Sequence, residues 1–292
     1  MFYIILCYFI FGLIFKSSYS FVLNKISKKL DEILLPYKHV YIEAYIWIKH
    51  MNPEVLSIKS HDKLNLTGLY IKNKKEKGLI ILSHGYRSNV RRDLYASTHE
   101  YYDMGYSLLL INSRGCESEG KYITFGYQES RDISSWVNYM HKKKPKLKII
   151  LGGISLGATS TLMVNNKYVS LMIVDSGYKN AYEEISYVIK HYFHLPAFIF
   201  MPMISFYTYL FMEFRLKDVN TFNNLSKIDI PILFIHGYED DFVLPQNTID
   251  NYNHYKHKKD ILIISGATHG MGYLVDRNSY INKIKEFIKK NI

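Results

Sequence analysis

A chain of 292 residues with 48% hydrophobic and 22% charged residues can bury a large core, and this composition excludes an intrinsically disordered protein. The formal net charge of +11 is compatible with a nucleic-acid partner. The lysines, however, are scattered or form short runs such as 142–144, and no nucleic-acid-binding motif accompanies them, so we expect no nucleic-acid partner.

The first residues differ from the rest of the chain. Residues 1–15 read MFYIILCYFIFGLIF and carry no charged side chain, and after Lys16 a mixed stretch, SSYSFVL, extends to residue 23 without a further charge. A helix needs about 20 residues to cross a bilayer, and one lysine can extend its side chain to the membrane surface. A cleaved signal peptide would begin with a positive region and end at small residues before the cut; here the positive region is missing, and Ser18-Tyr19-Ser20 is a poor cleavage site.

We therefore predict that residues 1–24 form a membrane anchor; the alternatives are a signal-like segment or an apolar helix packed on the domain. Lysines follow the apolar run but none precedes it. The tendency of positive loops to stay inside then predicts a membrane-associated protein whose remaining domain, residues 25–292, lies on the cytoplasmic side.

Short apolar runs alternate with helical patterns along that domain. An antiparallel strand pair is expected at 55–59 and 64–71, separated by a polar turn. Uninterrupted apolar runs, typical of strands buried on both faces, follow at 78–85, 107–115, 147–153, 171–175, 231–237 and 261–265. This alternation predicts an α/β fold with a mostly parallel central sheet flanked by helices.

One region, about residues 178–226, breaks the alternation. It is rich in Tyr, Phe, Met and Ile, as in the stretch LPAFIFMPMISFYTYLFMEF at 195–214. Because a loop of this length without secondary structure is rare, we expect helices here. Their apolar character predicts a lid over the site or a membrane-facing surface, and the alternative is a helix pair buried against the core.

The strongest chemical motif is the G-x-S-x-G sequence at 153–157, with Ser155 at its centre. A predicted strand precedes it and a predicted helix follows it, which is the setting of a nucleophile on a tight strand-to-helix turn. The helix N-terminus would favour a developing negative charge near the hydroxyl. The alternative is a serine that only caps the helix.

A serine nucleophile needs a base within hydrogen-bond reach. His269 follows the last predicted strand on a glycine-flanked loop, and catalytic groups in open α/β sheets gather at such strand ends. His84 and His236 also end strands, but each directly precedes a glycine, where we expect it to brace the turn.

The acid that orients the histidine should follow the penultimate strand, where the sequence IHGYEDDFVLP offers Glu239, Asp240 and Asp241. With Asp240, the order along the chain is serine, acid, histidine, as in hydrolases that carry this serine motif.

The segments SHGYRSN, INSRGCESEG, GGISLGAT, IPILFIHGYEDDFVLP and THG together resemble the α/β-hydrolase superfamily, near its serine-aminopeptidase-like and membrane-anchored esterase-like members. The resemblance covers about residues 55–290. It implies that the acid is Asp240 and that the backbone N–H groups of Tyr86 and Leu156 form the oxyanion hole. The chain departs from the family's D-x-R-G pattern at 112–115, where it reads Asn-Ser-Arg-Gly, and this loop is expected to be structural.

These observations predict a serine hydrolase that cleaves ester bonds of lipophilic, small-molecule acyl substrates, lipids among them, through an acyl-serine intermediate. The alternatives are a peptidase or amidase of the serine-aminopeptidase type, an acyltransferase that excludes water, and a non-catalytic binding protein with this fold. Nothing in the sequence indicates a metal or an organic cofactor. The two cysteines, Cys7 and Cys116, do not have the spacing of a zinc site. A histidine near its reference pKa of about 6.5 would make kcat/KM rise through mildly acidic pH.

Overall fold

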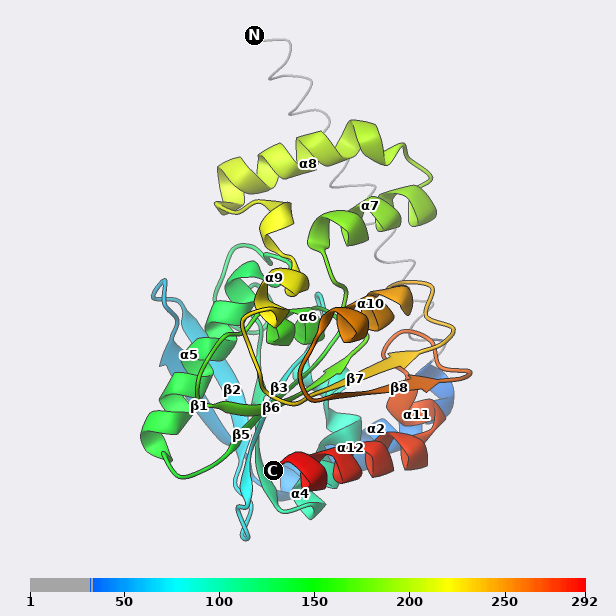
Figure 1. Ribbon diagram of the computed structural model, residues 1–292. Helices are drawn as coiled ribbons and strands as arrows, with labels where there is room; N and C mark the ends of the chain where they lie inside the picture. The colour runs from blue at the N-terminus through cyan, green and yellow to red at the C-terminus, as the bar shows by residue number, and fades with distance from the viewer. Residues whose placement is uncertain (1–31, 33) are drawn as a thin grey trace.

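The computed structural model describes residues 32 and 34–292, and its centre is one eight-stranded sheet (Figure 1). The strand order is β1-β2-β4-β3-β5-β6-β7-β8. The pairs β1–β2 and β2–β4 are antiparallel, and the remaining pairs are parallel. The predicted α/β fold with a mostly parallel sheet is confirmed. The strands are β1 (Glu54–Lys59), β2 (Asn65–Ile71), β3 (Gly78–Ser83), β4 (Tyr106–Ile111), β5 (Ile149–Ile154), β6 (Val169–Asp175), β7 (Ile232–Gly237) and β8 (Lys259–Ile264).

Helices cover both faces of the sheet, and each face has its own core. Strand β3 shows why its sequence is apolar without interruption: Ile80 and Leu82 pack on one side, and Leu79 and Ile81 on the other. The first side is covered by α2 (Lys38–His50), α4 (Tyr95–Asp103), α11 (Gly272–Val275) and α12 (Arg277–Asn291). The second is covered by α5 (Tyr127–Lys143), α6 (Leu156–Leu162), α9 (Thr221–Leu225) and α10 (Gln246–His254). Three short elements also occur in the described residues: η1 (Leu35–Tyr37), α3 (Val90–Asp93) and η2 (Leu216–Asp218).

Two further helices, α7 (Ala181–Tyr192) and α8 (Ala197–Met212), stand away from the sheet beyond α6 and α10 (Figure 1). We call this pair the cap helices. Their inner side chains, among them Ile189 and Met201, belong to a third apolar cluster that also contains Leu156 and Val243. The cap helices therefore pack over the start of α6. That they act as a lid stays a prediction.

The outer face of α8 leaves large side chains exposed, with Phe198 80% and Phe206 56% accessible. This helix has 16 residues and contains Pro202. At 1.5 Å per residue it is about 24 Å long, shorter than the roughly 30 Å hydrocarbon core of a bilayer.

The prediction of a membrane-spanning helix and of a membrane-associated localisation must be corrected. Across residues 32 and 34–292, no helix is both long and apolar enough to cross a membrane. The finding contradicts the predicted membrane-associated localisation. Residues 1–24, the predicted anchor, lie outside the described residues.

Candidate active site

The turn between β5 and α6 places Ser155 in strained backbone geometry. Its φ of 57° and ψ of −118° lie in a region that non-glycine residues rarely adopt. The conformation is held because the Ser155 N–H donates to the carbonyl oxygen of Asp175 at 2.8 Å, and because Gly157 lets α6 approach the end of β3 closely. The Ser155 side chain makes no capping hydrogen bond to α6, so the geometry does not favour the alternative of a simple helix cap.

His269 and Asp240 form a close pair on the loops after β8 and β7. Nδ1 of His269 lies 2.7 Å from Oδ2 of Asp240. Oδ1 of Asp240 accepts hydrogen bonds from the backbone N–H groups of Phe242 at 3.0 Å and Val243 at 2.9 Å. An ionised carboxylate can only accept, so Nδ1 carries the proton and Nε2 is the nitrogen left to act as a base. The other two candidate acids, Glu239 and Asp241, are exposed.

His236 is a second histidine that contacts Asp240. Its Nε2 lies 3.0 Å from Oδ2 of Asp240 and 2.8 Å from the carbonyl oxygen of Val243, and both are acceptors. Nε2 is therefore the protonated nitrogen, and Nδ1 accepts from the Thr248 hydroxyl at 2.6 Å. His236 is fully buried. It braces the turn, as expected, and it also positions Asp240.

The pair perturbs both pKa values. Burial alone would raise the pKa of Asp240, but the charge of His269 and hydrogen bonds from His236 and His269 hold it well below its ordinary value. Burial alone would lower the pKa of His269, yet the carboxylates of Asp240, Glu184 and Asp175 raise it above 6.5. The expectation of an unshifted histidine was wrong, because it did not include these neighbouring acids.

The histidine loop lies against the serine turn. A Cβ atom placed on Gly270 would be 3.3 Å from Cγ2 of Ile154, so the residues next to His269 and Ser155 touch. Within the described residues, no hydrogen bond joins the Ser155 hydroxyl to His269. Such bonds are often long without substrate and shorten when it binds.

The predicted oxyanion donors flank the same serine. Leu156 is the first residue of α6, and the first N–H groups of a helix have no partner within the helix. On the other side, a Cβ atom on Gly85 would lie 3.4 Å from the Ser155 Cβ, which places the loop carrying Tyr86 beside Ser155. Asp93 holds this loop by accepting from the Gly85 N–H at 2.7 Å and the Ser88 hydroxyl at 2.6 Å. Sequence reasoning missed Asp93.

His84, on the same loop, has a structural role. Its Nε2 accepts from the Ser113 N–H at 3.0 Å, so its Nδ1 donates to the Gly85 carbonyl oxygen at 2.9 Å. The ring is fully buried. It therefore ties the end of β3 to the end of β4.

No protein-family model matches the chain. The uncharacterized protein YqkD of Bacillus subtilis (strain 168) is 25% identical over 280 residues, covering 92% of this chain and 90% of that protein.

Solved structures match more clearly. The Pyrococcus furiosus esterase Pf2001 superposes with a TM-score of 0.69 and 23% identity, covering 83% of this chain and 93% of that one. The α/β hydrolase GrgF from Penicillium sp. sh18 gives 0.65 and 17% over 82% and 98%. An acylaminoacyl peptidase of Pyrococcus horikoshii gives 0.63 and 16% over 82% of this chain and 42% of its own length. The chain has the α/β-hydrolase fold.

The loop at 112–115, whose sequence departs from the D-x-R-G pattern, has a structural role, as expected. Arg114 is buried and pairs with Asp132 at 2.6 Å and with Asp62 at 2.9 Å. These two carboxylates and His61 lie within 4.8 Å of one another, which is the spacing of metal ligands. Because the Arg114 guanidinium already pairs with both carboxylates and places a positive charge among them, the cluster does not fit a metal cation.

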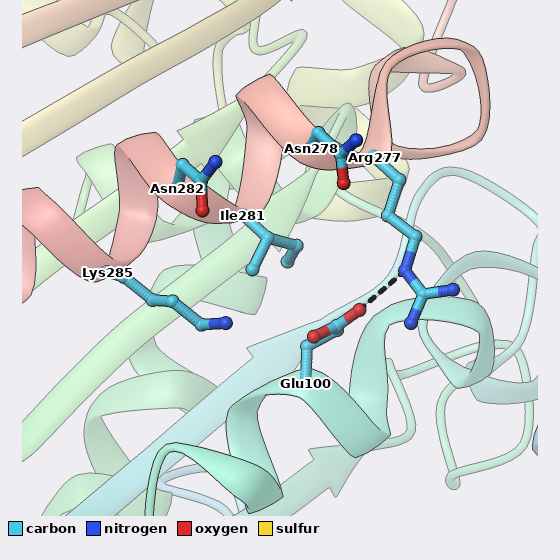
Figure 2. Close-up of a pocket in the computed structure, with 6 residues that line it drawn as sticks. All are labelled: Glu100, Arg277, Asn278, Ile281, Asn282 and Lys285. Carbon is cyan, nitrogen blue, oxygen red and sulfur yellow. Dashed lines mark hydrogen bonds and ion pairs between the residues drawn. The ribbon is translucent and has the colours of Figure 1, made fainter.

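A polar pocket lies between α4 and α12, on the side of the sheet away from the cap helices (Figures 1 and 2). In Figure 2 the Glu100 carboxylate points to Arg277, whose Nε donates to it at 2.6 Å. The opposite charges of Glu100 and Arg277 already compensate each other. Because this pocket and the helix that follows Ser155 cover opposite faces of the sheet, we assign the pocket no part in the chemistry.

Proposed function

We propose that this protein is a serine hydrolase that cleaves esters of lipophilic acyl groups. The observation that carries the proposal is the 2.7 Å contact between His269 and a buried Asp240, on loops next to a serine held in the strained turn of a nucleophile. The esterase Pf2001, a structural neighbour, supports a hydrolase of this type.

In the proposed reaction, the Ser155 hydroxyl oxygen attacks the ester carbonyl carbon while Nε2 of His269 takes its proton. The carbonyl π electrons move to oxygen, and the N–H groups of Tyr86 and Leu156 donate to this oxyanion; one such donor is worth roughly 3–4 kcal/mol. His269 then protonates the departing alcohol, which leaves the acyl group on Ser155. A water molecule, deprotonated by Nε2 of His269, then attacks the acyl carbon. The bond from this carbon to the Ser155 oxygen breaks, His269 returns the proton to Ser155, and the acid leaves.

The apolar side chains around the site support a lipophilic acyl group. Tyr86 and Phe125 stack with ring centres 5.5 Å apart, and Phe242 packs edge-on against His269 at 5.2 Å. Both contacts border the cluster formed by the inner faces of the cap helices. A long acyl chain would bury its methylene groups there, each worth about 0.8 kcal/mol.

Labelling with a fluorophosphonate tests the nucleophile. The wild-type protein should be labelled and Ser155→Ala should not. Ser160→Ala is the matched control, because Ser160 lies one turn further along α6 and its hydroxyl only donates to the Leu156 carbonyl oxygen. Labelling that persists in Ser155→Ala contradicts the assignment, and a wild-type protein that is never labelled favours a non-catalytic binding protein.

A peptidase or amidase is the second candidate, supported by the acylaminoacyl peptidase among the structural neighbours. Ester and amide cleavage use the same three side chains, so the substrate must separate them. A series of p-nitrophenyl esters of increasing acyl length, measured beside aminoacyl anilides, does so. We expect kcat/KM to rise with acyl length and to be higher for esters; faster anilide cleavage would favour the peptidase.

A further inference from the structure

Glu184, on the cap helix α7, is a buried carboxyl group without a matching partner. The residue is 9% exposed, and its Oε1 atom is buried without a hydrogen bond. Its neighbour Glu183 points outward and pairs with Lys179 at 3.3 Å. A buried polar group that lacks a partner destabilises a protein, so its presence requires a reason.

The cap helix α7 reaches the loop that carries Asp240, because the Tyr187 hydroxyl, one turn beyond Glu184, donates to the Asp241 carbonyl oxygen at 2.9 Å. Burial raises the pKa of Glu184 to about 8, the charge of His269 acts to lower it, and that of Asp240 acts to raise it. The same interaction works in reverse, since Glu184 helps to raise the pKa of His269. The other titratable neighbours are Tyr178 and Tyr187, whose pKa values are raised mainly by burial, with a smaller contribution from Glu184. No lysine or arginine is among the described groups that shift the pKa of Glu184.

We propose that Glu184 binds a primary ammonium group of the substrate, so that the natural ester carries an amine on an otherwise apolar skeleton. An ionised carboxylate only accepts hydrogen bonds, and Oε1 has its lone pairs unused. An ammonium group supplies both the donor and the opposite charge that the buried site lacks. The inference rests on the proposed ester hydrolysis, because it assigns the substrate class of that site.

A purely structural role does not explain why residue 184 is a glutamate. A leucine or methionine at residue 184 would fill the apolar cap cluster without an unpaired polar atom. The carboxylate would also offset the repulsion between a bound ammonium group and the imidazolium that forms during the reaction. Glu184 is therefore a binding residue, distinct from the groups that transfer protons.

Calorimetry with n-hexylamine tests binding without requiring turnover. Charge-assisted hydrogen bonds predict that wild-type protein binds n-hexylammonium about tenfold to a hundredfold more tightly than 1-hexanol. Glu184→Gln should lose that preference, whereas Glu183→Gln, the exposed neighbour on the same helix, should keep it. At pH 7 the binding enthalpy should depend on the buffer, because the ammonium displaces a proton from Glu184. Equal affinities for both probes, or an unchanged preference in Glu184→Gln, would overturn the proposal.

A matched pair of esters tests the substrate class. Methyl 6-aminohexanoate and methyl heptanoate differ by an ammonium group in place of a methyl group. Their kcat/KM ratio should fall at least about tenfold in Glu184→Gln and should stay at the wild-type value in Glu183→Gln. A ratio that stays the same contradicts the role of Glu184. Failure of the wild-type protein to hydrolyse either ester contradicts the ester hydrolase instead, and calorimetry still decides whether the amine binds.

Stability provides the folding control. Glu184→Gln and Glu184→Met remove a buried, unpaired carboxyl group, so their Tm should equal or exceed that of the wild-type protein. A gain in Tm together with a loss of amine binding would mark a residue retained for function. A lower Tm in both variants, with n-hexylamine binding unchanged, would identify Glu184 as a structural residue and refute the proposal.

Discussion

Gly157, in the first turn of α6, packs directly on the end of β3. A Cβ atom at this position would lie 2.2 Å from the carbonyl oxygen of Ser83 and 2.8 Å from that of His84, both of them backbone atoms. Ordinary van der Waals contact begins at 3.4 Å, so Gly157→Ala must separate α6 from β3 by about 1 Å. The displaced elements carry the nucleophile, Ser155, and the loop with Tyr86.

We expect kcat to fall by roughly 100-fold, which is the cost of a misplacement of about 1 Å at a reacting centre. The free energy of unfolding should fall by only about 1–3 kcal/mol, as for other overpacked sites. Hydrolysis of p-nitrophenyl butyrate gives kcat, and urea unfolding gives the stability. The two measurements together distinguish a displaced site from an unfolded protein.

Ile284→Val is the control, because Ile284 is fully buried on α12, on the face of the sheet away from the cap helices. It should lose about 0.5–1.5 kcal/mol of stability with kcat unchanged. If Gly157→Ala kept kcat within about twofold of wild type, the close packing of α6 on β3 would not position Ser155, and the reasoning would fail.

Three further predictions concern the charged groups. Asp240→Asn should lower kcat for p-nitrophenyl butyrate by about 10⁴-fold, since an amide favours the wrong histidine tautomer; a loss below tenfold would contradict the assignment. The kcat/KM of the wild-type protein should rise with pH, with a midpoint above 6.5, because neighbouring acids raise the pKa of His269; a midpoint at or below 6.5 would contradict this. Asp132→Asn leaves the buried Arg114 without its closest partner, at 2.6 Å, and should lower the unfolding free energy by roughly 3–5 kcal/mol in urea. Asp62→Asn, which removes the more exposed partner, should cost less than about 1 kcal/mol.

The fold could be predicted because strands buried on both faces leave a clear mark in the sequence. The run at 78–83 is apolar throughout, since alternate residues serve two different cores. The order of strands could not be predicted in this way. Strand β4 lies between β2 and β3, as the pairing of Ile111 with Gly68 on one side and with Ser83 on the other shows.

The candidate site was predictable where a local motif fixes the geometry and unpredictable where tertiary contacts do. Ser155 stands in a recognisable turn, and Asp240 and His269 follow strands. Glu184 is one of two adjacent acids in the first turn of α7, where the helix dipole favours negative charge on either. Its position three residues after the buried Ala181 was a signal that it faces inward, but the unpaired state of its carboxyl group depends on elements more than fifty residues away.

In the proposed hydrolase, the groups that carry out the chemistry and those that select the substrate occupy different parts of the fold. The serine, the acid and the histidine follow β5, β7 and β8, and parallel strands bring their carboxyl ends to one edge of the sheet. Hydrogen bonds from the sheet and its loops hold each of them, as Asp175 does for Ser155 and His236 for Asp240. The cap helices contribute apolar contacts and a single buried acid. Substitutions in the cap should therefore change which ester is preferred while the proton-transfer groups keep their geometry.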